Sequence, residues 1–340
     1  MNTMMKKLTA ILLSLLMIAS LAACGTKEEE TTEAATTAAE ETTAEAADDT
    51  EAAEEETEAW VWDGPKYDEL FANLGKADVD LSKAEGVLKK VLDSGELIIG
   101  TSPDYPANEF VDVATGEVKG SEILIAKYIA NSLGVELKIE SMDFNAVLAA
   151  ADTGKVDLAI SGFGYKADRA EAYELSHGYQ ALSGDAHHTI VCLTKDLDKF
   201  NSLDDFKGLK VDAQANSLQQ MYMEDQVPDA ELLLVSTLDQ AIMELIAGRV
   251  DAVALDSTTA KNYAAQSDGQ IVSLYDEKKI EFDLSLYSDY AGNVCAVKKG
   301  ETSFMEVINE CIDQLLESGD YATWYYAACD AAGIQPEEEE

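Results

Sequence analysis

Short apolar runs alternate with amphipathic segments along most of this chain. Apolar runs that predict strands cover residues 97–100, 135–139, 156–160, 189–193, 209–213, 232–235, 250–255 and 294–297. Segments with apolar residues three and four positions apart predict helices over 122–133, 144–152, 238–247 and 304–316. Ser82-Lys83-Ala84-Glu85 matches a capping box, which predicts one further helix before the first strand. Strands that alternate with helices indicate an α/β fold.

The third predicted strand leads into a turn of small residues. This turn contains Ser161, Gly162, Phe163 and Gly164, and Arg169 follows shortly after. Small residues leave backbone N–H groups accessible and let a ligand approach the main chain. A guanidinium beside such amides suits a carboxylate, because its planar fork can bind both oxygens. A surface arginine after an ordinary turn is the alternative.

The segment before this turn has a counterpart in the second half of the chain. Gly154-Lys155-Val156-Asp157 is similar to Gly248-Arg249-Val250-Asp251, and both copies lie between a predicted helix and a predicted strand. Arg169 lies beyond the first strand and Asp256 beyond the second. Ligands of open α/β sheets bind outside the carboxyl ends of the strands. Two facing lobes with these opposite charges would therefore suit a small zwitterion, although Asp256 could instead cap a helix.

Together these segments resemble the extracellular solute-binding proteins of ABC importers, in particular the family that binds polar amino acids. The resemblance covers residues 97–326 and includes Leu97-Ile98-Ile99-Gly100-Thr101, Tyr105-Pro106, the repeated segments, Arg169 and Asp256. It implies a type II periplasmic-binding-protein fold, in which two α/β lobes close about a two-strand hinge. It also implies that the arginine binds the α-carboxylate of an amino acid and that the aspartate binds its α-amino group.

The resemblance gives other residues a place in the expected site. Tyr105 would cover the ligand, Ser102 replaces an acid that some relatives use for cationic side chains, and Ser121 replaces a common aromatic residue. Asn216 and Ser217 open a predicted helix whose free N–H groups would face the ligand. We therefore expect a neutral or polar amino acid. The expected ligand-binding residues are Ser102, Tyr105, Ser121, Ser161, Gly162, Phe163, Gly164, Arg169, Asn216, Ser217 and Asp256, with no catalytic residue, metal or cofactor.

The N-terminal region predicts secretion and a lipid anchor. Lys6 and Lys7 precede an apolar run that ends in Leu21-Ala22-Ala23-Cys24-Gly25. This pattern looks like a bacterial lipobox, so residues 1–23 would be a signal peptide and Cys24 would carry the lipid. Residues up to 59 are almost entirely Thr, Ala, Glu and Asp, which indicates a disordered stalk rather than an Ala/Glu helix.

The expected organisation follows from these segments. A signal peptide (1–23) and a stalk (24–59) precede a helical extension (60–94), the first lobe (95–181), the second lobe (182–292), a return segment of the first lobe (293–332) and an acidic tail (333–340).

Composition narrows the range of partners. The formal net charge is −42, so the surface should repel nucleic acid phosphates and anionic lipid headgroups. Cys192, Cys295, Cys311 and Cys329 match no zinc-ligand spacing, and their spacing does not say whether any of them form disulfides. The chain has no nucleophile elbow, no phosphate-binding glycine loop and no HExxH motif.

The sequence thus predicts a monomeric binding protein anchored on the outer face of the bacterial cytoplasmic membrane. It would pass an amino acid to the permease and ATPase of an ABC importer. Two alternatives stay open. One is a dehydratase-like enzyme on the same scaffold, with Glu109 or Glu122 as its acid or base. The other is a ligand-sensing domain for a membrane partner.

Overall fold

The computed structural model describes residues 60–179, 187–287 and 292–336. The expected signal peptide, stalk and lipidated Cys24 lie outside these ranges. So do the predicted crossing near Gln180 and the end of the acidic tail. Among the described helices, none combines the length and the apolar character needed to cross a membrane.

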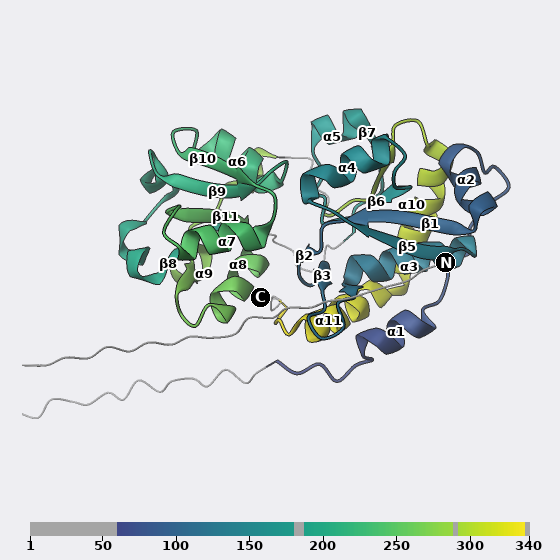
Figure 1. Ribbon diagram of the computed structural model, residues 1–340, viewed down its shortest axis with the longest axis horizontal. Helices are drawn as coiled ribbons and strands as arrows, with labels where there is room; N and C mark the ends of the chain where they lie inside the picture. The colour runs from purple at the N-terminus through teal and green to yellow at the C-terminus, as the bar shows by residue number, and fades with distance from the viewer. Residues whose placement is uncertain (1–59, 180–186, 288–291, 337–340) are drawn as a thin grey trace, which may run out of the picture. The chain divides into compact units, whose positions relative to one another are not determined.

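The first lobe is built on a five-stranded sheet in the order β5-β1-β6-β13-β7 (Figure 1). β1 pairs in parallel with β5 and β6, whereas β13 runs antiparallel to β6 and β7. The strands are β1 (Glu96–Thr101), β5 (Glu136–Ser141), β6 (Leu158–Ala159), β7 (Tyr173–Leu175) and β13 (Ala296–Lys298). A small antiparallel sheet of β2 (Asp104–Tyr105), β3 (Glu109–Val111) and β4 (Val118–Lys119) adjoins it.

Helices cover both faces of this sheet. Leu97 and Ile99 of β1 belong to a core that includes α2, α3, α10 and α11, whereas Ile98 packs toward α4 on the other face. This alternation is expected, because successive side chains of a strand point to opposite faces. The helices of this lobe are α1 (Tyr67–Asn73), α2 (Gly86–Ser94), α3 (Ser121–Leu133), α4 (Phe144–Asp152), α5 (Ala167–Ala172), α10 (Thr302–Ser318) and α11 (Asp320–Ala332).

The second lobe has its own five-stranded sheet in the order β10-β9-β11-β8-β12. One core packs it against α6 and α9, and another against α7 and α8. The strands are β8 (His188–Leu193), β9 (Lys210–Gln214), β10 (Glu231–Val235), β11 (Ala252–Asp256) and β12 (Ile271–Ser273). The helices are α6 (Leu218–Gln226), α7 (Leu238–Ile246), α8 (Ser257–Gln266) and α9 (Leu274–Lys278), with short 3-10 turns at Thr194–Lys199, Leu203–Phe206 and Leu284–Leu286.

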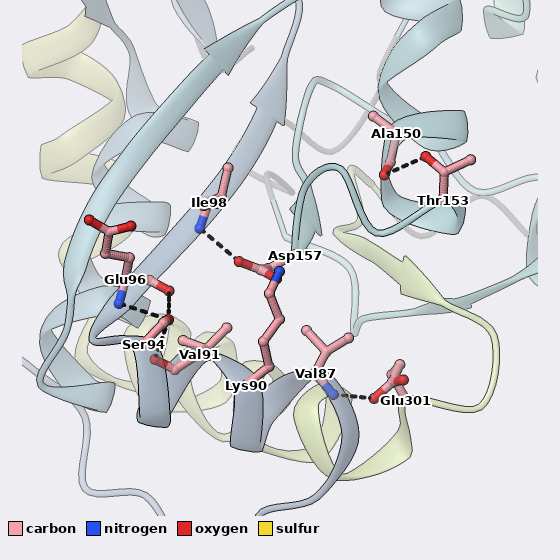
Figure 2. Close-up of polar contacts among 10 residues, drawn as sticks. All are labelled: Val87, Lys90, Val91, Ser94, Glu96, Ile98, Ala150, Thr153, Asp157 and Glu301. Carbon is pink, nitrogen blue, oxygen red and sulfur yellow. Dashed lines mark hydrogen bonds and ion pairs between the residues drawn. The ribbon is translucent and has the colours of Figure 1, made fainter.

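The repeated segments make the same pair of hydrogen bonds in both lobes. The N–H of Asp157 donates to the carbonyl of Ile98, and the Asp157 carboxylate accepts the Ile98 N–H at 3.0 Å (Figure 2). Asp251 makes the same pair of bonds with Lys210, its carboxylate accepting the Lys210 N–H at 2.9 Å. Each aspartate thus joins its own strand to the neighbouring strand. The predicted strand over 156–160 is correspondingly shorter, since only Leu158 and Ala159 belong to β6.

The start of α2 differs from the prediction. The N-cap is Glu85, with no side-chain capping bond, so the expected capping box does not form. Instead the carboxylate of Glu301, from the segment before α10, accepts the Val87 N–H at 2.7 Å (Figure 2). A residue far away in the sequence therefore satisfies an N–H group that a helix start leaves free.

The two segments that join the lobes meet at a short antiparallel bridge. Tyr179 and Asn293 exchange backbone hydrogen bonds of 2.8 and 3.0 Å, and Val294 N–H donates to the carbonyl of Phe163. The chain therefore leaves the first lobe and returns to it along neighbouring segments. After the return, β13 lies between β6 and β7 in the first sheet. The described residues form two α/β lobes joined in this way, which confirms the predicted fold class.

Candidate functional site

One pocket is lined by residues of both lobes. The first lobe contributes Tyr105, Ser161, Gly162, Gly164 and Arg169 from the predicted set, and the second lobe contributes Ser217 and Asp256. The sequence argument expected an arginine and an aspartate from opposite lobes at one site. The structure places Arg169 and Asp256 on the wall of the same pocket.

Arg169 lies in α5 and is 5% exposed. Its guanidinium stacks on the Phe163 ring at 5.0 Å, donates to the Gly164 carbonyl, and donates to the Asn216 carbonyl of the second lobe at 3.0 Å. Burial lowers the pKa of Arg169 to about 10, so the group remains a cation at neutral pH. The bond to Asn216 makes this cation a link between the lobes.

The turn of small residues packs tightly against other parts of the protein, which leaves less of its backbone open to a ligand than the sequence suggested. Gly162 has φ 57°, and a Cβ there would lie 2.6 Å from the Tyr105 ring. Its N–H donates to the Glu122 carboxylate at 2.8 Å. The expectation that this amide is open to a ligand is therefore wrong, because a buried acid already accepts its hydrogen bond.

Gly164 faces the second lobe directly. A Cβ at this position would lie 2.4 Å from a methyl group of Leu218, at the start of α6. The backbone of Gly164 has no positive φ. The glycine is thus required for the close approach of the lobes and not for its own conformation.

Asp104 forms a second link between the lobes. Its carboxylate accepts the Leu238 N–H at the start of α7 and the side-chain amide of Gln214, both at 2.9 Å. The Ser102 hydroxyl donates to the other oxygen at 2.9 Å. Burial raises the pKa of Asp104, while the hydrogen bonds from Leu238 and Ser102 oppose the rise. A carboxylate of the first lobe thus satisfies a helix N-terminus of the second.

Asp256 has two roles that the sequence left as alternatives. It ends β11 and is the N-cap of α8, where its carboxylate accepts the Thr259 N–H at 2.9 Å. It also lines the pocket. Ser217 does likewise as the N-cap of α6, with its hydroxyl accepting the Gln220 N–H at 3.1 Å.

Four predicted residues lie outside the pocket lining: Ser102, Ser121, Phe163 and Asn216. Their contacts are with other protein groups near the pocket. The Ser102 N–H donates to the Ser161 hydroxyl at 2.8 Å, and the buried Ser121 hydroxyl donates to the Asn108 side chain. The Phe163 ring packs against the Arg169 guanidinium, and Asn216 accepts a hydrogen bond from that arginine through its backbone carbonyl.

Sequence reasoning did not find several lining residues. They are Asp104, Phe144, His187, His188, Gln214, Leu218, Gln219, Leu238, Leu255, Ser257, Thr258, Asn293, Tyr325, Tyr326 and Pro336. Glu109, which the sequence analysis named only for the enzyme alternative, also lines the pocket. Asp104 stands beside Tyr105, so its position in the expected loop was an available signal. His188 is buried beside Tyr222, and Gln219 contacts its ring nitrogen at 2.9 Å. Burial lowers the pKa of His188 to about 4, so its imidazole is neutral.

The described residues show no cluster of three or more metal-ligating side chains. Cys192, Cys295, Cys311 and Cys329 are buried free thiols. Burial raises the pKa of Cys192 to about 12, so this thiol stays protonated.

Two proteins with similar sequences are named for the amino acid that they bind. The arginine-binding extracellular protein ArtP of Bacillus subtilis (strain 168) is 25% identical over 227 residues, 66% of this chain and 82% of ArtP. The L-cystine-binding protein TcyJ of Escherichia coli (strain K12) is 24% identical over 237 residues, 69% of this chain and 83% of TcyJ.

The fold also matches solved structures. An amino acid ABC transporter substrate-binding protein from Streptococcus pneumoniae, bound to L-arginine, superposes with a TM-score of 0.64 at 27% identity. The match covers 74% of this chain and 100% of that one. The family of bacterial extracellular solute-binding proteins, family 3, matches residues 97–327. Apart from Glu96 at the start of β1, both five-stranded sheets fall within that match, as do all lining residues of the pocket except Pro336. The chain therefore belongs to this family.

Proposed function

We propose that this protein is the substrate-binding component of an ABC importer and holds an amino acid between its lobes. The observation that carries the proposal is the pairing of a buried cation, Arg169, with a carboxylate, Asp256, in one pocket lined by both lobes. Because each end of a zwitterion would contact a different lobe, binding would favour the closed arrangement.

The carboxylate of the ligand would meet Arg169. A guanidinium has five N–H donors, and the bonds of Arg169 to Gly164 and Asn216 use one at each terminal nitrogen. The Phe163 ring packs against the Arg169 guanidinium and restricts its orientation. Donors therefore remain for a planar anion, and their orientation is already set.

The ammonium group of the ligand would meet Asp256. The Thr259 N–H donates to one carboxylate oxygen, which holds the Asp256 side chain at the pocket wall. Its place at the end of β11 matches the position expected for ligand contacts in open α/β sheets.

A neutral or polar side chain is the best match for the rest of the pocket. Among the other lining carboxyls, Asp104 accepts donors from both lobes, and Glu109 has one oxygen bonded to the Ser161 hydroxyl at 3.2 Å. A second cation on the ligand would have to compete with those donors. This argument favours a ligand unlike the arginine in the solved relative.

The tether and the partners belong to the same proposal. The lipobox pattern ending at Cys24 supports a lipid-anchored, monomeric protein on the outer face of the cytoplasmic membrane, beside a permease and an ATPase. We expect Cys24→Ser to move the protein from the membrane fraction to the medium. Retention of this variant in the membrane would contradict the lipid anchor.

The experiment for the site is titration calorimetry after a thermal-shift screen of the amino acids. We expect Arg169→Ala to weaken binding by about 3–5 kcal/mol, since the ligand carboxylate would be buried without a partner. Asp256→Ala should also weaken binding. Arg249→Ala is the matched control, because this exposed arginine occupies the repeated segment of the second lobe. Equal affinity in the R169A and R249A variants would refute the carboxylate assignment.

The enzyme alternative makes a different prediction. Glu109 is a buried carboxyl on the pocket wall, as an acid–base residue would be. If the ligand identified in the screen is chemically changed on prolonged incubation, the protein is an enzyme; recovery of unchanged ligand supports a binding protein.

A further inference from the structure

Two buried glutamates lie at the pocket wall, which Glu109 itself lines. Glu109 in β3 is 1% exposed, and Glu122 in the first turn of α3 is fully buried. Both carboxyl groups bond to the same turn, Glu109 to the Ser161 hydroxyl and Glu122 to the Gly162 N–H. The backbones are held close as well, because the Glu122 N–H donates to the carbonyl of Asn108 at 3.0 Å.

The two carboxyls have unequal surroundings. Glu122 accepts three donors: the Gly162 N–H at 2.8 Å, the Tyr179 hydroxyl at 2.7 Å and the Asn293 side-chain amide at 3.2 Å. Glu109 accepts the Ser161 hydroxyl on one oxygen, whereas its other oxygen is buried and meets no protein donor.

A hydrogen bond between two carboxyls needs a proton, because an ionised carboxylate is an acceptor only. Glu122 is the better anion, since it has three donors and the N-terminus of α3 favours negative charge. A proton on the free oxygen of Glu109 gives that buried oxygen a partner. Burial, followed by the charge of Glu122, holds the pKa of Glu109 well above its usual value.

The other titratable groups near the pair do not supply a compensating charge. Asp104 faces Glu109 from β2 and adds to the repulsion. Tyr321 of α11 faces both glutamates, and Cys295 beside β13 faces Glu122. The pKa values of Tyr179, Tyr321 and Cys295 are all raised by burial, so these three groups are neutral.

The pair connects the pocket wall to the hinge. Ser161 and Gly162 belong to the turn that lines the pocket, whereas Tyr179 and Asn293 form the bridge between the two joining segments. All four depend on the two glutamates for a hydrogen bond. We propose that Glu109 is a positioning residue that holds one proton against the Glu122 carboxylate, and that this proton keeps the pocket turn fixed to the hinge.

The location of the proton can be tested without a ligand. Glu109→Gln keeps a donor toward Glu122 and an acceptor for Ser161, so it mimics the protonated acid. Glu122→Gln places an amide N–H against existing donors in either orientation. We expect the infrared carbonyl band of a protonated carboxylic acid in the wild type and its loss in E109Q. We also expect E122Q to melt well below both proteins.

The pH dependence has a definite sign. The folded state holds the Glu109 proton more tightly than the unfolded chain does, whose carboxyls titrate at about pH 4.3. The stability of the wild type relative to E109Q is therefore greatest at or below about pH 4 and is lost as the pH rises toward the folded pKa. We expect E109Q to melt above the wild type at alkaline pH by several degrees, and this advantage to shrink as the pH falls. A constant difference across pH, or an E122Q variant as stable as E109Q, would overturn the assignment.

The link to binding rests on the proposed function. Ionisation of both glutamates would push them apart and release the pocket turn, so wild-type affinity should fall at alkaline pH while that of E109Q stays level. Parallel pH profiles in the two proteins would overturn the coupling. If no amino acid binds the wild type at any pH, the proposed function fails, whereas the infrared and melting results still decide where the proton lies.

Discussion

Two carboxylates on the pocket wall also make structural hydrogen bonds to helix N-termini. Asp256 caps α8 and lines the pocket, and Asp104 caps α7 across the lobe boundary. Asp157 and Asp251 instead have purely structural contacts, each completing a strand pair. An acidic chain can thus place its carboxylates where backbone N–H groups lack partners, which turns part of its charge excess into specific hydrogen bonds.

The repeated aspartates allow a matched comparison of stability. Asp157 is buried and also pairs with Lys90 at 2.7 Å, whereas Asp251 is exposed. We expect Asp157→Ala to lower the free energy of unfolding by about 2–3 kcal/mol, because the Ile98 N–H loses a charged acceptor inside the protein. Asp251→Ala should cost about 1 kcal/mol or less, since water can replace the carboxylate. Urea unfolding of both variants measures the difference, and equal losses would contradict the role of burial.

Individual elements depend on partners from distant parts of the chain. α2 begins with an N–H group bound to Glu301, and α7 begins with an N–H group bound to Asp104. α6 carries its own cap in Ser217, and α7 also has a local cap, because the Thr237 hydroxyl accepts the Gln240 N–H. Only the local caps have a sequence signature, so element boundaries that rely on distant carboxylates were open to misreading.

Removal of the distant cap should affect α2. We expect Glu301→Ala to lower the free energy of unfolding by about 1 kcal/mol, the usual cost of losing a helix cap. Ser82→Ala is the control, because Ser82 makes no capping bond to the helix. If S82A were the more damaging change in chemical denaturation, the predicted capping box would form in solution after all.

At the scale of the whole described molecule, the two lobes are held together by a few specific contacts. Arg169 bonds to Asn216, Asp104 bonds to the start of α7, and Tyr105 packs on an apolar cluster of the second lobe. Gly164 permits this approach by leaving room for Leu218. These contacts set the geometry in which a ligand would meet both lobes.

A methyl group on residue 164 would clash with Leu218 and should hold the two lobes apart. We expect Gly164→Ala to weaken ligand binding by about 1–3 kcal/mol, the typical cost of overpacking, with little change in the stability of either lobe. Small-angle scattering with ligand should show a more open molecule. The double variant G164A/L218A should recover part of the affinity, and a further loss instead would argue against the steric explanation.

The sequence by itself determined the fold class, most strands and helices, and two of the charged residues that line the pocket, Arg169 and Asp256. These features follow from local periodicity and from the rule that ligands bind beyond strand ends, and both can be read from nearby residues. Tertiary structure alone decided that the Gly162 N–H donates to Glu122, that Asp104 bridges the lobes, and that Glu109 and Glu122 bond to the same turn. Those contacts join residues separated by long stretches of chain, and their energies depend on burial, which no local pattern records.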